Sequence, residues 1–211
     1  MNNYLIVFVL AIAGLLFFFK GDKIRTDPRD PEVDDPRDPE REKDRLKNIL
    51  ENEGYKSFLR VNRMEEYIRQ RNPYINDQEI DQIIYSVMKY SSKYRVNPYY
   101  IFAIIDQEST FDPEANGRDG EIGLMQLMPI AFQEVIRNYE NEFETVNRSW
   151  LYKIDYNIKA GVLFYTICRD HAGNLWETLA IYNEWVNYKS AGSNYADLVE
   201  QRIINMVERG I

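Results

Sequence analysis

The feature that most limits how this chain can fold is an uncharged segment near its start. Tyr4–Phe19, YLIVFVLAIAGLLFFF, holds sixteen residues without a charge. A membrane-spanning helix needs about 20 apolar residues, and about 17 is near the lower limit. Asn2, Asn3 and a Lys20 side chain that reaches toward the lipid headgroups would extend the segment to that length. We therefore expect residues 1–20 to form a transmembrane anchor.

Two other interpretations of this segment stay open. A cleaved signal peptide would have a basic start and small residues at the cleavage site, whereas the chain starts Met-Asn-Asn and bulky Phe17–Phe19 stand there. A buried core helix is the other alternative. The orientation is ambiguous, because Lys20, Lys23 and Arg25 all follow the segment. The positive-inside rule alone would place the rest of the chain in the cytoplasm.

Residues 21–45 have the composition of an extended linker. Asp-Pro-Arg-Asp-Pro-Glu occurs at 27–32 and again at 35–40, and the two copies hold four of the eight prolines. Proline lacks an amide hydrogen and disfavours helix in the residue before it, so this stretch should be extended and solvated. We expect a spacer between the anchor and a globular domain at 46–211. A disordered tail would give the same sequence.

Composition excludes several kinds of site. The net charge is -8, which argues against nucleic acid as a partner because a phosphate-binding surface must be basic. Cys168 and His171 are the only cysteine and histidine, so an intrachain disulfide is impossible and a Cys/His metal site is too poor in ligands. We expect no metal, and a structural role for His171.

The patterns after the linker are helical, so the fold class should be mainly α. Asn76 with Glu79 three residues later forms a capping box, and Asn97 before Pro98 indicates a second helix start. Helical spacing follows the first start at Ile80, Ile83, Ile84, Val87, Ser91 and Tyr94, and recurs near the end at Tyr195, Leu198, Val199, Arg202, Ile203, Met206 and Val207. The glycine-rich stretch Asp112–Gly123 predicts a loop or a small hairpin.

Glu108 is the candidate for acid–base chemistry. It follows Ile101, Ile104 and Ile105 at helical spacing and therefore continues an apolar stripe that should be buried. Burial raises the pKa of a carboxyl group, as a general acid near neutral pH requires. An ion-paired carboxylate at a helix end is the alternative. Asp106 lies on roughly the opposite face, where we expect it to be solvated.

Two motifs, one that begins at Glu108 and one that begins at Gly123, resemble those of a known enzyme family. ESTFDP at 108–113 and GLMQLMP at 123–129 resemble, in sequence and spacing, the first two motifs of the lysozyme-like (goose-type or soluble) lytic transglycosylase family. IYN at 181–183 resembles the third motif, and NIKAG at 157–161 resembles the helix start before it. Tyr195 resembles the final motif tyrosine, which is a weak signal.

The resemblance runs from about Ile83 to Val207 and implies a lysozyme-like (α+β) helical domain that needs no cofactor. The family cleaves the β-1,4 bond between N-acetylmuramic acid and N-acetylglucosamine in peptidoglycan glycan strands. Glu108 would protonate the leaving oxygen and then take the proton of the muramic acid 6-hydroxyl, which closes a 1,6-anhydro ring. The positions that match the sugar-binding residues of the family are Ser109, Gln126, Met128, Tyr182, Asn183 and Tyr195.

Some of these residues also have plain structural interpretations. Met128 and Tyr182 are suited to a core, and Asn183 and Ser109 to capping a helix end.

The sequence departs from the family pattern at two positions. Gly117 stands where the family commonly has a serine, and Glu121 stands where it favours alanine. An alternative to the anhydro reaction is that Glu121, with Asp119 nearby, is a second carboxylate that positions a water. The reaction would then be hydrolysis, as in a lysozyme, instead of anhydro-ring formation.

Three functional hypotheses follow. The first is a membrane-anchored lytic transglycosylase whose catalytic domain faces the cell wall, at a bacterial inner membrane or in a phage particle. The second is a peptidoglycan-binding assembly protein without turnover, which an intact Glu108 and Gln126 argue against. The third is a membrane protein with secretion-complex or virion partners, which is compatible with the first because such assemblies open the wall locally.

Overall fold

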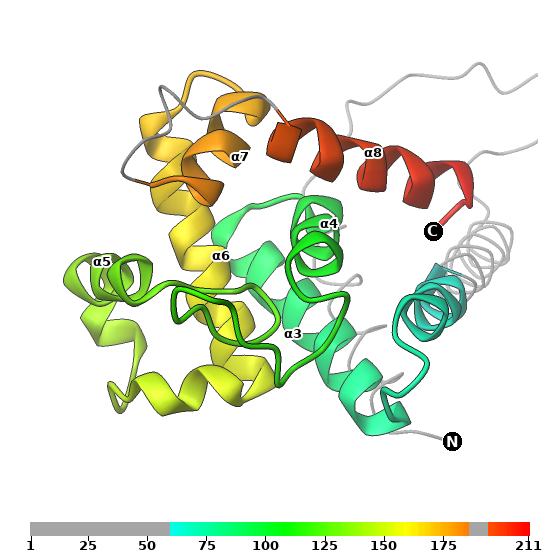
Figure 1. Ribbon diagram of the computed structural model, residues 1–211, viewed down its shortest axis with the longest axis horizontal. Helices are drawn as coiled ribbons and strands as arrows, with labels where there is room; N and C mark the ends of the chain where they lie inside the picture. Colours follow the sequence, from blue (N-terminus) through cyan, green and yellow to red (C-terminus); the bar gives the residue numbers. More distant parts are fainter. Residues whose placement is uncertain (1–59, 186–193) are drawn as a thin grey trace, which may run out of the picture. The chain divides into compact units, whose positions relative to one another are not determined.

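The computed structural model describes residues 60–185 and 194–211 of the chain (Figure 1). These residues belong to one compact unit, Leu59–Ile211. The predicted anchor at Tyr4–Phe19, the predicted linker at 21–45 and the start of the predicted domain at 46–59 lie outside the described residues. They stay predictions.

The described residues are folded mainly into helices, as the sequence predicts. Residues 60–71 are helical, and they precede α3 (Asp77–Tyr94), α4 (Pro98–Glu108), α5 (Pro129–Tyr139), the short 3-10 turns η1 (Glu140–Glu142) and η2 (Arg148–Tyr152), α6 (Ile154–His171), α7 (Leu175–Asn183) and α8 (Asn194–Glu208). None of these described helices is long and apolar enough to cross a membrane.

Both predicted helix starts are confirmed. The Asn76 side chain accepts from the backbone N–H of Glu79 at 3.0 Å, and the Glu79 carboxylate accepts from the backbone N–H of Asn76 at 3.1 Å. Asn97 caps α4 by accepting from the backbone N–H of Tyr99 at 3.0 Å, with Pro98 as the first helical residue. These caps satisfy amide groups that otherwise have no partner in a first helical turn.

The stretch between α4 and α5 is a loop with little strand pairing. Only two isolated antiparallel bridges occur in this described stretch, Asn116 with Ile122 and Ile122 with Leu127. Gly120 and Gly123 have φ values of 90° and 74°, which residues with a side chain rarely adopt. The predicted loop is therefore confirmed, and its hairpin character is limited to those bridges.

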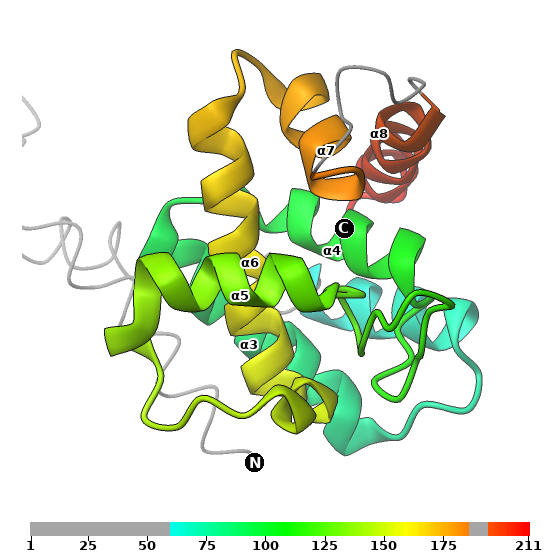
Figure 2. The ribbon, with the colours of Figure 1, turned by 60° about the vertical axis from the view of Figure 1, so that its left-hand side comes forward.

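Helix α6 forms the centre of the core. Ala160–Cys168 is a run of nine residues that are all buried, and α6 contacts α3, α5 and α7 (Figures 1 and 2). Figure 2 shows α5 crossing in front of α6 with α3 behind it. The loop is bonded to α6 through the Asn157 side chain, and α4 packs against α3.

Helix α4 is covered on all sides, and this corrects one prediction. Residues 101–106 are all buried, and the Asp106 side chain, expected to be solvated, is fully inaccessible. The reason is that α8 packs along α4, and residues of the 60–71 helix also contact Asp106. Helical periodicity in α4 alone could not show this second covering layer.

Candidate active site

Glu108 is the last residue of α4, at the point where the helix meets the loop. Its side chain is only partly accessible to solvent. The hydroxyl of Tyr195, in the first turn of α8, donates to Oε1 of Glu108 at 2.5 Å. Two residues 87 positions apart in the sequence are therefore joined by a short hydrogen bond to the candidate acid.

The surroundings of Glu108 favour its protonated form. The pKa of Glu108 is raised to about 7, because burial among protein atoms raises it most, the hydrogen bond from Tyr195 lowers it in part, and the negative charge of Glu121 raises it. Burial, together with the Glu108 charge, also raises the pKa values of Tyr182 and Tyr195 well above the usual range. Both tyrosines therefore remain hydroxyl donors near neutral pH, while Glu108 can give and take a proton there.

The turn after Glu108 is fixed by an unusual backbone conformation. Thr110 and Phe111 have φ values of 54° and 60°, in the left-handed region that side chains disfavour. Phe111 is fully buried against Tyr67, and its carbonyl oxygen accepts from the Asn72 side chain at 3.0 Å. These contacts impose the sharp turn that ends α4 at the candidate acid.

Ser109 acts as a structural link at this turn. Its hydroxyl lies 3.1 Å from the carbonyl oxygen of Ile105, one helical turn back, and 2.8 Å from that of Leu124 in the loop. The capping role that the sequence left open for Ser109 is thus present, and it also ties the second motif to the end of α4. A role of Ser109 in sugar binding stays a prediction.

Asn157 organises the second motif, although it is not among the predicted site residues. Its side chain is buried, accepts from the backbone N–H of Met125 at 2.9 Å, and donates to the carbonyl oxygens of Ile122 and Leu151 at 2.9 and 2.7 Å. A Cβ atom at Gly123 would lie 2.4 Å from the Asn157 amide nitrogen, so only glycine fits there. The motif match at 157–161 was the signal that could have identified it.

The Gln126 side chain links two parts of the loop by hydrogen bonds. Its side-chain amide donates to the carbonyl oxygens of Ala115 and Gly123 at 3.1 and 2.8 Å, and its φ of 43° places it in the left-handed region. Because these bonds use the amide nitrogen, a sugar contact by Gln126 would fall to its carbonyl oxygen.

The remaining predicted binding residues differ in how accessible they are. Tyr182 is buried, and its hydroxyl donates to the carbonyl oxygen of Met125 at 2.9 Å, which ties α7 to the loop. Met128 is partly buried against the core at the start of α5, and Asn183 is exposed at the end of α7. The core interpretation left open for Tyr182 is therefore present. Contacts of all three with a sugar stay predictions.

The two departures from the family pattern are connected in space. A Cβ atom at Gly117 would lie 2.1 Å from Oε2 of Glu121, so a side chain at 117 and the present position of Glu121 exclude each other. Oε2 of Glu121 also accepts from the backbone N–H of Asp119 at 2.9 Å. Glu121 is thus held within the loop, where its charge acts on Glu108.

Metal ligation has no obvious place in the part of the chain that the structure describes, where no group of three or more His, Cys, Asp or Glu residues could hold an ion. His171 lies at the end of α6 and contacts Trp185 with ring centroids 5.5 Å apart. Cys168 is buried and unpaired.

Comparison with known proteins agrees with the motifs. Residues 86–196, which are 111 of the 211 residues, match the family described as "Transglycosylase SLT domain". The chain is a member of this family. The resemblance expected from the two motifs is thereby confirmed.

Relatives of this SLT-domain chain include two curated bacterial proteins named membrane-bound lytic murein transglycosylase C. The one from Glaesserella parasuis is 36% identical over 84 residues, which are 40% of this chain and 23% of that protein. The one from Pectobacterium atrosepticum is 28% identical over 94 residues, which are 44% of this chain and 26% of that protein. The match thus spans only about a quarter of the length of these relatives.

A solved structure supports the fold of the SLT domain. An inactive mutant of the lytic transglycosylase Slt from Pseudomonas aeruginosa superposes with a TM-score of 0.51 at 21% sequence identity. The superposition covers 59% of this chain and 24% of that one. At this identity the likeness concerns the arrangement of the helices alone.

Proposed function

We propose that this chain is a lytic transglycosylase that cleaves the β-1,4 bond between N-acetylmuramic acid and N-acetylglucosamine in peptidoglycan. The observation that carries the proposal is Glu108, a carboxyl with a pKa of about 7 that ends α4 and begins the first family motif. Membership of the SLT family and the names of the curated relatives support the same activity.

In the proposed reaction Glu108 acts first as acid and then as base. Its proton goes to the glycosidic oxygen as the bond from that oxygen to the muramic acid C1 breaks. The resulting carboxylate accepts the proton of the 6-hydroxyl, and the 6-oxygen forms a bond to C1. Glu108 ends protonated and no water is consumed, so one carboxyl group suffices where most glycosidases use two. Tyr195, which donates to Glu108, would stabilise the carboxylate between the two proton transfers.

The role of Glu108 is tested by replacing it with glutamine. Glu108→Gln keeps the size of the side chain and an acceptor for Tyr195 but holds no transferable acidic proton. We expect clearing of cell walls in a zymogram to fall by more than about 100-fold, with an unchanged circular dichroism spectrum. Near-normal clearing by this variant would rule out the assigned role. Absence of clearing by the wild type as well would favour a non-catalytic glycan-binding protein.

A second candidate activity is hydrolysis, as in a lysozyme. It is favoured by one observation, the carboxylate of Glu121 in the loop, whose charge reaches Glu108. Glu121 would position a water that replaces the 6-hydroxyl as nucleophile. Mass spectrometry of the released muropeptides separates the two reactions, because the anhydro product is lighter by one water. We expect the anhydro product from the wild type.

The setting that we propose is a membrane-anchored protein with its catalytic domain toward the cell wall. Support comes from the uncharged segment Tyr4–Phe19 and from relatives named membrane-bound. Fractionation with and without this segment, and protease access to the domain in spheroplasts, would test anchoring and orientation. A place in a secretion complex or a virion stays a prediction, for which pull-down of assembly partners is the test.

A further inference from the structure

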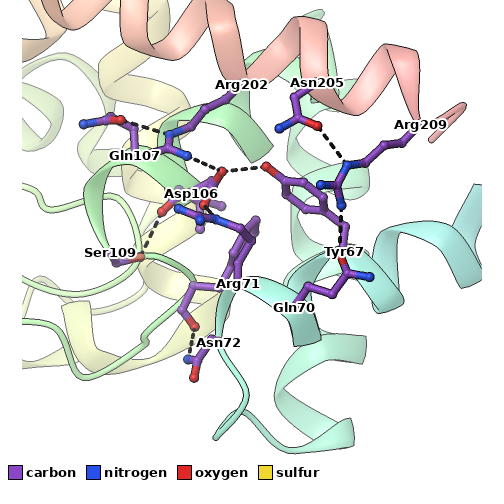
Figure 3. A network of polar contacts seen from close by, with 12 residues as sticks. Tyr67, Gln70, Arg71, Asn72, Asp106, Gln107, Ser109, Arg202, Asn205 and Arg209 are labelled. Carbon is purple, nitrogen blue, oxygen red and sulfur yellow. Dashed lines mark hydrogen bonds and ion pairs between the residues drawn. The ribbon is translucent and has the colours of Figure 1, made fainter.

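A charged cluster centred on a buried carboxylate lies beside the candidate acid and takes no part in the proposed reaction. Its centre is Asp106, whose side chain has no solvent exposure. Oδ1 of Asp106 lies 2.5 Å from Nε of Arg71, Oδ2 lies 3.0 Å from Nη1 of Arg202, and the Tyr67 hydroxyl donates to Oδ2 at 2.6 Å (Figure 3). The cluster thus joins the 60–71 helix, α4 and α8.

The buried carboxylate of Asp106 depends on its partners for stability. A carboxylate removed from water is tolerated only when charged partners and hydrogen bonds compensate for its lost hydration. Both carboxylate oxygens of Asp106 are occupied, and burial and the bond to Asp106 raise the pKa of Tyr67 above its ordinary value, so that it stays a donor. A small shift of α8 would separate the ion pair between Arg202 and Asp106, while Arg71 and Tyr67 would stay bonded to Asp106.

Helix α8 carries both a member of this cluster and the partner of the candidate acid. The last three residues of α4 each accept a hydrogen bond from α8. Arg202 donates to Asp106 and, from its Nε at 2.9 Å, to Oε1 of Gln107. Tyr195 donates to Glu108. Arg202 and Tyr195 are seven residues apart, about two helical turns, so they lie along one side of α8.

From these contacts we propose that Asp106 and Arg202 are positioning residues that hold α8 against the end of α4 so that the Tyr195 hydroxyl meets Glu108. Neither residue touches the reacting atoms, and they act through Tyr195. The consequence for the reaction rests on the proposed function, whereas the consequence for Glu108 itself does not.

The proposal predicts how Glu108 titrates when the cluster is broken. The charged and titratable groups that face Glu108 are Tyr195 from α8, Tyr182 from α7 and Glu121 from the loop. Of these, the Tyr195 hydrogen bond lowers the pKa of Glu108. Losing that bond should therefore raise the pKa, and since the acid must start protonated, the fall of kcat/KM at high pH should move to higher pH.

The decisive variant is Arg202→Met, which keeps an unbranched apolar stem and removes the guanidinium. Arg209→Met is the matched control. Arg209 follows α8 and also ties it to the 60–71 helix, donating to Asn205 at 2.8 Å and to Gln70 at 2.7 Å (Figure 3). Its guanidinium carbon also lies 5.4 Å from the centre of the Tyr67 ring, but Arg209 makes no bond to Asp106 or to any other residue of α4.

The experiment measures the NMR chemical shift of the Glu108 carboxyl carbon as a function of pH, in the full chain labelled with ¹³C-glutamate. The signal of Glu108 is assigned by its loss in Glu108→Gln. We expect Arg202→Met to raise the pKa of Glu108, as Tyr195→Phe does. The double variant should have the same Glu108 pKa as Tyr195→Phe alone. In Arg209→Met, Glu108 should titrate as in the wild type. In parallel, kcat/KM on purified peptidoglycan should fall about 10-fold to 100-fold for Arg202→Met.

Two results would overturn the proposal. The first is an Arg202→Met protein that is less stable but in which Glu108 titrates as in the wild type. The second is a double variant in which the Glu108 pKa changes caused by Arg202→Met and Tyr195→Phe add. If Arg202→Met does not fold, Arg202→Lys replaces it, because lysine keeps the charge but cannot bond Asp106 and Gln107 as a fork. An inactive wild type with the expected titration shifts would remove the proposed function and leave this inference standing.

Discussion

At the scale of single residues, Glu108 illustrates how a functional group lowers the stability of its own fold. Its pKa is near the ordinary value in the unfolded chain and about 7 in the folded one. Between those two values the folded protein holds a proton that the unfolded chain has lost. Stability therefore falls as pH rises through this window and is constant above it.

This imbalance predicts that Glu108→Gln becomes more stable than the wild type as pH rises. The two proteins should be alike below pH 4.5, and the variant should gain at most about 3 kcal/mol by pH 8, since partial exposure screens some of the effect. Urea unfolding across pH 4 to 8 measures it. Gln133→Ala, at an exposed residue of α5 without a titratable group, is the control and should show no such trend. A constant difference between Glu108→Gln and the wild type would show that burial does not raise this pKa.

At the scale of elements, the loop between α4 and α5 is held in place by the start of α6. Asn157 bonds three buried backbone groups of the loop and of η2, and each would lose its partner in Asn157→Ala. At roughly 1–3 kcal/mol for each unsatisfied group, we expect a loss of about 3 kcal/mol or more in urea unfolding. Asn138→Ala, at an exposed asparagine of α5, should change stability by less than about 0.5 kcal/mol. Equal effects of the two substitutions would contradict this role.

The same loop allows a test of how its two unusual residues depend on each other. Gly117→Ser places a Cβ atom against the Glu121 carboxylate and should cost about 1–3 kcal/mol. In a Glu121→Gly background, which also removes the Glu121 Cβ atom that would lie at 2.7 Å, the collision disappears, and the serine should be neutral or stabilising by up to about 1 kcal/mol, because it restricts the unfolded chain. The free energy of unfolding in urea is measured for the four proteins of this double-mutant cycle. The coupling energy between positions 117 and 121 must exceed about 0.5 kcal/mol to support the contact.

At the scale of the whole molecule, the described residues form a core of their own. Its buried residues come from the 60–71 helix through to Ile211. We therefore predict that deleting Tyr4–Phe19 leaves a folded, soluble and active domain, as judged by thermal unfolding and wall clearing. Aggregation of the deleted form would show instead that the segment belongs to the core.

Much of this architecture followed from local patterns in the sequence. The caps at Asn76 and Asn97 depend on residues at most three positions away, so they were predictable from spacing alone. The glycine-rich loop was predictable for the same reason, and the two motifs identified Glu108 and the family. The error at Asp106 arose because periodicity describes one face of a helix and says nothing of a second layer that covers the other.

The sequence alone predicted the helices that begin near Asn76, Asn97 and Tyr195, the loop, the family and the identity of the candidate acid, since each depends on residues close together in the chain. The groups that surround that acid follow from the packing of the helices. Tyr195 reaches Glu108 across 87 positions, and Arg202 reaches Asp106 across 96. The proton affinity of a carboxyl group depends on burial and on charges within a few ångströms, and those neighbours are brought together by packing.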